Sequence, residues 1–188
     1  FGGEINEAIN PAIGIELFHN FTLLHDDIMD QAPLRRGKET VYKKWNPNVA
    51  ILAGDTMFAL ANKYMLRTRQ QAISQVMELF NQTAIEVCEG QQYDMDYEHQ
   101  ANVSIADYIE MIRLKTAVLL AASLKTGAII AGAEASDCDY IYQFGIHIGL
   151  AFQLKDDLLD VYGVQEKFGK VSGGDIIAGK KTYLYLKA

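Results

Sequence analysis

The sequence of 188 residues contains little cysteine and no excess of basic residues. Its two cysteines, Cys88 and Cys138, have neither the spacing of a metal site nor the pattern of a disulfide framework. Free thiols are typical of a reducing compartment, so we expect a cytoplasmic protein. The net charge of −7 is opposite to the basic face that binding of nucleic acid requires, so no nucleic-acid partner is expected.

Long uninterrupted apolar runs are also missing. The most hydrophobic stretch, residues 117–133, is short for a membrane span, and Lys125 interrupts it. We therefore interpret this stretch as a buried helix and expect no transmembrane segment.

Proline is scarce, with three residues in the chain, and apolar residues recur at helical spacing. Pro11 and the pair Asn46-Pro47 each predict a helix start, because proline is tolerated in the first helical turn. Ser104 is another predicted cap. No segment shows the sustained alternation of a strand. The expected helices are at about 11–30, 47–68, 70–92, 104–113, 116–133 and 136–161, with glycine-rich residues 162–181 as a loop. Together they predict an all-α helical bundle that forms a single domain.

Aspartates are concentrated at two places in the chain. DDIMD at residues 26–30 and DDLLD at residues 156–160 share the form D-D-x-x-D, and each follows an apolar helical run. On a helix, the first and last aspartates of each cluster lie on one face and repel one another. Carboxylates without cysteine nearby favour a hard cation such as Mg²⁺, which also binds phosphate. Two clusters therefore predict a diphosphate held between them by metal ions, whereas a single cluster would fit a solvated helix face equally well.

Basic residues and glycines follow each cluster. Arg35-Arg36-Gly37 comes after the first cluster, in a predicted loop. Lys170 and Lys180 come after the second cluster, in the glycine-rich segment, whose spacing does not fit a Walker loop. Each lysine alone would be typical of a solvated surface, but together these groups offer the cations that a diphosphate needs.

These motifs resemble those of the trans-isoprenyl diphosphate synthase family, the polyprenyl synthetases. LHDDIMD at residues 24–30 with RRG at 35–37 is similar to the family's first aspartate-rich motif, and FQLKDDLLD at 152–160 is similar to its second. Gly54-Asp55, Gly90-Gln91 and Lys115-Thr116 match weaker motifs in the same order. The resemblance covers nearly the whole chain and implies a helical bundle of the isoprenoid synthase type with a central apolar cavity.

The resemblance also implies an enzyme, a prenyltransferase that condenses isopentenyl diphosphate with an allylic diphosphate and releases pyrophosphate. Mg²⁺, with Mn²⁺ as a substitute, is the implied cofactor, and a homodimer is the implied assembly. The implied metal ligands are Asp26, Asp30 and Asp156, with Asp27, Asp157 and Asp160 in or near the coordination shell. The implied ligands of the allylic diphosphate are Arg35, Lys115, Gln153, Lys170 and Lys180, with Thr116 beside them. Arg36 and His19 would bind isopentenyl diphosphate, and Asp26, Asp30, Arg35, Lys115 and Lys180 would be catalytic.

The implied reaction passes through an allylic carbocation that the double bond of isopentenyl diphosphate attacks, after which the departing pyrophosphate takes up a proton. An apolar cavity keeps water from the cation. Phe21, five residues before Asp26, is the predicted floor of this cavity. We therefore expect a short product, farnesyl or geranylgeranyl diphosphate, and favour geranylgeranyl diphosphate because Thr22 is small.

The family's upstream G-x-K-x-x-R motif is missing from the sequence, so the chain is expected to be a fragment that lacks N- and C-terminal parts. Three other interpretations compete with the resemblance. A class I terpene cyclase normally has an Asn/Ser/Glu pattern instead of a second D-D-x-x-D. A non-catalytic subunit of a heteromeric synthase tends to lose aspartates. A phosphohydrolase of the HD type, built on His25-Asp26, needs further histidines at a suitable spacing.

Overall fold

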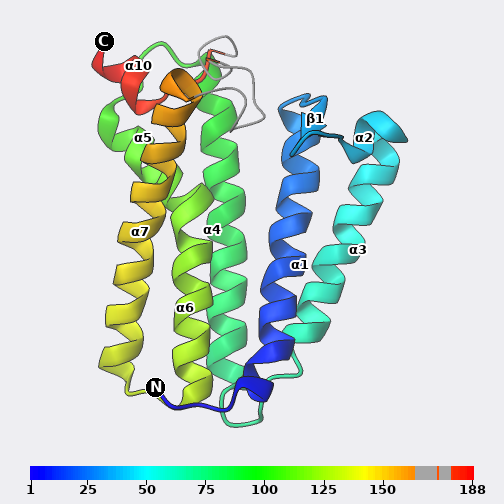
Figure 1. The fold of residues 1–188 in the computed structure, drawn as a ribbon, viewed down its shortest axis with the longest axis vertical. Coiled ribbons are helices and arrows are strands. Elements are labelled where there is room, and N and C mark those ends of the chain that lie inside the picture. The colour runs from blue at the N-terminus through cyan, green and yellow to red at the C-terminus, as the bar shows by residue number, and fades with distance from the viewer. Residues whose placement is uncertain (164–172, 174–178) are drawn as a thin grey trace. The chain divides into compact units, whose positions relative to one another are not determined.

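The structure, a computed structural model, describes residues 1–163, 173 and 179–188, and these residues are mostly helical (Figure 1). The chain divides into two compact units. Unit 1 comprises Phe1–Glu78 and Thr126–Glu134, and unit 2 comprises Leu79–Lys125 and Ala135–Ala188. Two of the long helices, α4 (Ile73–His99) and α6 (Val118–Ala131), contribute residues to both units. The predicted all-α class is confirmed for the described residues.

Unit 1 is built on the packing of α1 (Ile5–Met29) against α3 (Pro47–Met65). Gly14 of α1 allows close approach, because a Cβ atom there would lie 2.7 Å from the Sδ atom of Met65. The buried side chains of Phe18 and Met65 form part of the apolar interior of this unit. The predicted start of α3 is confirmed: the Oδ1 atom of Asn46 accepts a hydrogen bond of 2.9 Å from the backbone N–H of Val49, and Pro47 follows.

The predicted start of the first helix at Pro11 is wrong, since α1 begins at Ile5 and contains Pro11. Proline inside a helix removes one backbone donor and crowds the preceding turn. The ring of Pro11 is among the most completely buried side chains of the protein, so its packing helps to offset this cost.

A short hairpin occupies the loop predicted around Arg35-Arg36-Gly37, after the first cluster. Strands β1 (Leu34–Arg35) and β2 (Lys38–Glu39) pair in antiparallel fashion. Arg36 and Gly37 form the turn with φ angles of 53° and 73°, and two successive positive values characterise a type I′ hairpin turn. Strands this short leave no alternating pattern in a sequence, which is why the hairpin was not predicted. The short helix α2 (Val41–Lys44) follows it.

Unit 2 contains α5 (Ile105–Ile112), the π-helical turn η1 (Arg113–Ala117), α7 (Ala135–Tyr162) and α10 (Tyr183–Lys187), besides its parts of α4 and α6. Ser104 caps α5 as predicted, and Asp107 completes a capping box with it. Tyr108, Met111 and Ile112 form a buried cluster in this unit. Helix α7 packs closely at Gly145 and Gly149, where a Cβ atom would lie 2.5 Å from the Cα atoms of Ala121 and Ala117.

Helix α4 continues to His99 instead of ending near the predicted residue 92. The side chains of the polar extension support one another at helical spacing. Gln92 donates a hydrogen bond of 2.8 Å to Asp96, and the rings of Tyr93 and Tyr97 stack with centroids 5.7 Å apart.

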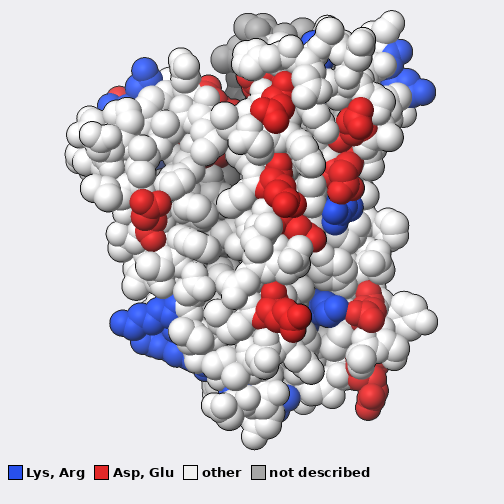
Figure 2. Space-filling view, turned by 180° about the vertical axis from the view of Figure 1, so that it is seen from behind, with Lys and Arg blue, Asp and Glu red and all other residues white. Residues whose placement is uncertain are grey.

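Among the described residues, no helix is both long and apolar enough to cross a membrane. On the face shown in Figure 2, acidic and basic side chains are interspersed and separated by wide uncharged areas.

Candidate active site

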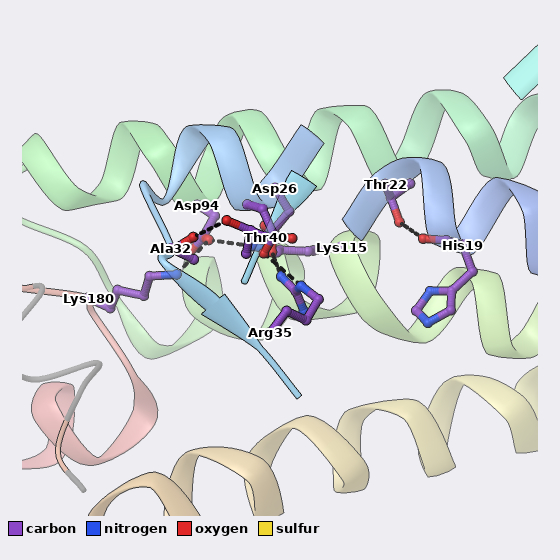
Figure 3. A network of polar contacts seen from close by, with 10 residues as sticks. His19, Thr22, Asp26, Ala32, Arg35, Thr40, Asp94, Lys115 and Lys180 are labelled. Atoms are coloured by element: carbon purple, nitrogen blue, oxygen red, sulfur yellow. Dashed lines mark hydrogen bonds and ion pairs between the residues drawn. The ribbon is translucent and has the colours of Figure 1, made fainter. Parts of the chain in front are cut away.

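The first aspartate cluster lies at the C-terminal end of α1, and the hairpin supplies its counter-charge. Arg35 of β1 donates from Nη2 to Asp26 Oδ2 over 2.9 Å and from Nε to Asp27 Oδ1 over 2.7 Å (Figure 3). A guanidinium group suits this task because its donors form a rigid fork. Asp26 is half-buried and Asp30 is exposed. The structure thus brings together three of the predicted site residues, Asp26, Asp27 and Arg35, within unit 1.

Asp27 differs from its neighbours because it is buried, with 5% of its surface exposed. Burial raises the pKa of the Asp27 carboxyl group, and the hydrogen bond and charge of Arg35 oppose this rise. The negative charges of Asp26 and Asp30 raise the pKa further. Arg35 therefore stabilises the ionised form of a carboxylate that has lost most of its contact with water.

The hairpin is held against the end of α1 by Thr40. Its hydroxyl group donates a hydrogen bond of 2.8 Å to the backbone carbonyl of Ala32. The turn then places successive arginines differently: Arg35 lies in the strand and reaches back to the cluster, while Arg36 lies in the turn and is exposed. Arg35 therefore contacts the carboxylates, and Arg36 faces the solvent.

His19 lies two turns before the cluster on α1, and its ring is half-buried. Burial lowers the pKa of the imidazole, and the charges of Arg36 and Arg35 lower it further, against an opposing effect of Glu16. His19, Arg35 and Arg36 thus belong to the same unit, where the two guanidinium charges affect the imidazole. A neutral imidazole has one N–H donor and one acceptor nitrogen.

Phe21 belongs to an aromatic group on the α1 and α3 helices. Its ring stacks on Phe58 with centroids 5.2 Å apart and contacts Phe18 at 5.6 Å and His25 at 4.7 Å. Gly54 of α3 leaves the space that the His25 ring occupies, since a Cβ atom there would collide with that ring. The predicted floor residue is thus fixed by ring contacts on several sides.

The second aspartate cluster lies near the C-terminal end of α7 and is anchored by neutral groups. Tyr108 of α5 donates a hydrogen bond to Asp157 Oδ2, and Gln153 Nε2 donates one of 3.0 Å to Asp157 Oδ1. Gln153 in turn accepts a bond of 3.0 Å from the hydroxyl group of Thr116. Burial raises the pKa of Asp157, and these hydrogen bonds oppose the rise. Asp160 is also buried, whereas Asp156 is half-buried.

Lys115 and Lys180 come together at a carboxylate that was not among the predicted site residues. The Nζ atom of Lys115 lies 2.6 Å from Asp94 Oδ2, and that of Lys180 lies 3.7 Å from the same oxygen (Figure 3). Lys170, the remaining predicted lysine, lies outside the described residues.

Comparisons with known proteins identify the family of the chain. A sequence model of the polyprenyl synthetases matches residues 2–188. The chain belongs to the polyprenyl synthetase family. It is 39% identical to the geranylgeranyl diphosphate synthase of Methanosarcina mazei, in an alignment that covers 100% of this chain and 58% of that protein.

Two crystal structures show the same fold. One, of a geranylgeranyl pyrophosphate synthase, has 54% sequence identity and a TM-score of 0.96, covering 99% of this chain and 57% of the other. The other, of a geranylgeranyl pyrophosphate synthetase from Pyrococcus horikoshii, has 41% identity and a TM-score of 0.94, with the same coverage of 99% and 57%. The predicted isoprenoid synthase fold is thereby confirmed. This polyprenyl synthetase chain spans 57–58% of the length of these relatives.

The less buried carboxylates of each cluster have the chemistry of ligands for a metal ion whose coordination a substrate completes. Among the described residues, no group of three or more His, Cys, Asp or Glu side chains could hold a metal ion by itself. Mg²⁺ is often bound by one or two carboxylates together with water and substrate phosphates. Each unit offers such oxygen atoms separately: Asp26 and Asp30 in unit 1 are less buried than Asp27, and Asp156 in unit 2 is less buried than Asp157.

Sequence reasoning missed Tyr108 and Asp94. Tyr108 lies on the apolar face of a short helix, so the sequence pattern does not indicate that its hydroxyl group binds a carboxylate. Asp94 could have been found, because it is four residues after Gly90 and therefore on the same face of one helix as a motif that was recognised.

Proposed function

We propose that the complete protein containing this chain is a short-chain prenyltransferase that joins isopentenyl diphosphate to an allylic diphosphate and releases pyrophosphate. One observation carries the proposal: within a polyprenyl synthetase, both D-D-x-x-D clusters are intact, and the second aspartate of each is buried and held by donors from another element. Maintaining a buried carboxylate is costly unless its partners are in place. Such anchoring would be useful in clusters whose less buried carboxylates, those of Asp26, Asp30 and Asp156, must be accurately positioned.

The residues that contact substrate divide between the two phosphate-bearing molecules. Arg35, Lys115 and Lys180 would bind the diphosphate of the allylic substrate, with Gln153, Thr116 and Lys170 beside them. Arg36 and His19 would bind isopentenyl diphosphate. The lowered pKa of His19 supports a neutral ring at pH 7, whose N–H would donate to a phosphate oxygen.

Asp26, Asp30 and Asp156 would hold Mg²⁺, for which Mn²⁺ could substitute, while Asp27, Asp157 and Asp160 would support these ligands from the interior. Bound Mg²⁺ would supply electrostatic stabilisation to the leaving pyrophosphate. The protein's own cations would stabilise the leaving group in the same way. As the C–O bond breaks, negative charge develops on the diphosphate oxygens, and Arg35, Lys115 and Lys180 would stabilise it. The new carbon–carbon bond then forms at the allylic carbon, and pyrophosphate takes up the proton that is lost.

The expected product is geranylgeranyl diphosphate, with farnesyl diphosphate as the shorter alternative. Support comes from Phe21, which its contacts with Phe18 and Phe58 hold in one place on α1. A rigid ring can stop a growing chain, whereas a mobile one would yield. Relatives described above carry geranylgeranyl in their names.

Replacement of Phe21 tests this assignment of product length. Phe21→Ala is expected to shift the products toward longer chains, measured by chromatography after removal of the diphosphate. The stability cost should stay below the roughly 3–5 kcal/mol of a fully buried phenylalanine, because Phe21 is half-buried. Phe144→Ala, at an exposed position of α7, is the matched control. An unchanged product distribution in an active Phe21→Ala protein would show that another group limits the chain.

We also propose that the complete protein is a homodimer. Helix α3 exposes several large apolar side chains, and such surface is typical of an interface. They are Val49, Ile51, Leu52 and Leu60. Size-exclusion chromatography with light scattering measures the mass, and a monomer over the full working range of concentrations would contradict the proposal.

A direct assay tests the reaction. The complete protein is incubated with labelled isopentenyl diphosphate and one allylic primer at a time: dimethylallyl, geranyl or farnesyl diphosphate. Each pair of substrates is tested in Mg²⁺, in Mn²⁺ and in EDTA. We expect chain elongation with either metal and none in EDTA. Absence of any elongated product with all three primers would overturn the proposed function, and full turnover in EDTA would overturn the role of the metal.

A further inference from the structure

Asp94 occupies an unusual place in unit 2, because two lysines from different parts of the chain meet at one of its oxygens. Lys115 belongs to η1 and Lys180 to the segment before α10, and their Nζ atoms lie 2.6 Å and 3.7 Å from Asp94 Oδ2 (Figure 3). All three side chains are largely removed from solvent: 11% of Asp94, 23% of Lys115 and 20% of Lys180 remain exposed. In the Lys125–Asp139 ion pair, by contrast, 71% of the Asp139 side chain is exposed.

The backbone around this group is shaped to bring Lys115 to Asp94. Gly90, one turn before Asp94 on α4, has no space for a Cβ atom, which would collide with the backbone N atom of Lys115 and lie 2.7 Å from the carbonyl carbon of Leu114. The same stretch, Arg113–Ala117, is a π-helical turn, a rare conformation that is often found at functional sites. Close packing of α4 on η1 therefore sets the distance between Asp94 and the ammonium group of Lys115.

The positive charges of Lys115 and Lys180 explain the effect of the Asp94 carboxylate. Two ammonium groups at one oxygen repel each other strongly in a partly buried site. One carboxylate between them reduces that repulsion, and its single charge does not cancel the charges of both lysines. Each ammonium group has three N–H donors, so it can bind Asp94 and a phosphate oxygen at the same time.

We propose that Asp94 is a positioning residue of the diphosphate site. Its carboxylate holds the ammonium groups of Lys115 and Lys180 where they can bind the phosphate oxygens of the allylic substrate. The inference rests on the proposed function for the identity of the substrate. Its physical content is independent of turnover, because pyrophosphate presents the same phosphate oxygens. Asp94 acts through the lysines and need not contact the substrate itself.

The experiment compares Asp94→Asn with Asp96→Asn in the complete protein. Asp96 lies on the same helix but is exposed, and its contact is a hydrogen bond of 2.8 Å from Gln92. We expect Asp94→Asn to raise the KM for the allylic diphosphate and the Kd for pyrophosphate with Mg²⁺, measured by calorimetry, by about 10- to 100-fold, as expected for a displaced ligand-binding group. The KM for isopentenyl diphosphate should stay unchanged, and Asp96→Asn should match the wild type.

A double-mutant cycle distinguishes positioning from a general structural effect. In a Lys115→Met, Lys180→Met background, Asp94→Asn should have little further effect on the Kd for pyrophosphate, because the groups through which it acts are gone. Asp94→Glu should recover most of the affinity that Asp94→Asn loses, since it restores the charge. A residue needed only for packing would give the opposite order, because glutamate adds a methylene group to a tight site.

Failure of the inference is distinguishable from failure of the proposed function. A wild-type protein that binds pyrophosphate but makes no elongated product overturns the function, while calorimetry still tests Asp94. An active wild type with an Asp94→Asn variant indistinguishable from Asp96→Asn overturns the inference, as do additive effects in the cycle. Should Asp94→Asn fail to fold, Asp94→Ser carries the test: a rise confined to the allylic KM supports the role, and equal or absent changes for both substrates refute it.

Discussion

The two aspartate clusters have the same sequence pattern but different anchors. In unit 1, the buried Asp27 is bound by the guanidinium group of Arg35, which also binds Asp26. In unit 2, the buried Asp157 is bound by the neutral side chains of Tyr108 and Gln153. A cation compensates the charge of a buried carboxylate, whereas neutral donors stabilise the carboxylate and leave its charge in place.

The basic residues of the two units also differ in the carboxylates that they bind. In unit 1, Arg35 lies directly on the aspartates. In unit 2, Lys115 and Lys180 share a separate carboxylate, Asp94, which belongs to another helix. The comparison shows that one sequence motif can be supported by two electrostatic arrangements, so the motif alone does not identify the partners of its residues.

The strongest test of the comparison removes one outer aspartate from each cluster. We expect Asp26→Ala and Asp156→Ala each to reduce kcat by at least about 10²–10³-fold, because either change would remove a proposed ligand of the metal ion. Steady-state assays of product formation measure the loss. Asp137→Asn, an exposed change on α7, is the control. Near-normal turnover in one variant would show that the clusters are unequal in function as well as in anchoring.

The second test asks whether Arg36 of unit 1 and Lys180 of unit 2 serve different substrates. Arg36→Ala should raise mainly the KM for isopentenyl diphosphate, and Lys180→Ala mainly that for the allylic diphosphate. We expect each rise to be about 10- to 100-fold, the effect of losing one charged hydrogen bond of about 1.5–3 kcal/mol. Lys187→Ala, at an exposed position, is the control. Equal effects of both variants on both substrates would refute the division.

A third, smaller effect is expected at the anchor of Asp157. Tyr108→Phe removes a donor from a buried carboxylate and should lower the free energy of unfolding by about 1–3 kcal/mol. Urea denaturation measures the change. Tyr140→Phe on α7, where 75% of the side chain is exposed, should leave stability unchanged. If both variants are as stable as the wild type, the bond between Tyr108 and Asp157 does not support the second cluster.

The smallest effect concerns the pH dependence of unit 1. Burial lowers the pKa of His19, so the unfolded chain binds a proton more readily than the folded chain. The stability due to the neutral ring is therefore complete above the ordinary pKa of histidine and falls as the pH drops through that value toward the lowered one. His19→Gln should flatten the curve of Tm against pH between about pH 5 and 8. His99→Gln, at an exposed position, should keep the wild-type curve, and identical curves for both variants would contradict the prediction.

Several features follow from the sequence by itself, because they depend on local patterns. The helical period of apolar residues led to the all-α class, and the two D-D-x-x-D clusters led to the family, which the comparisons confirm. The starts of α3 and α5 were predictable from Asn46-Pro47 and Ser104, since a cap needs only neighbouring residues. The roles assigned to individual site residues stay predictions.

Other features depended on the tertiary structure, because they join residues that are distant in the chain. Tyr108 and Asp157 are 49 positions apart, and Asp94 and Lys115 are 21 apart, so no local pattern relates them. Burial distinguishes Asp27, Asp157 and Asp160 from the other aspartates of the two clusters. The start of α1 before Pro11 likewise depends on packing, which offsets a poor local preference. Local sequence determined which groups are present, and the packing of the helices determined which of them are buried and paired.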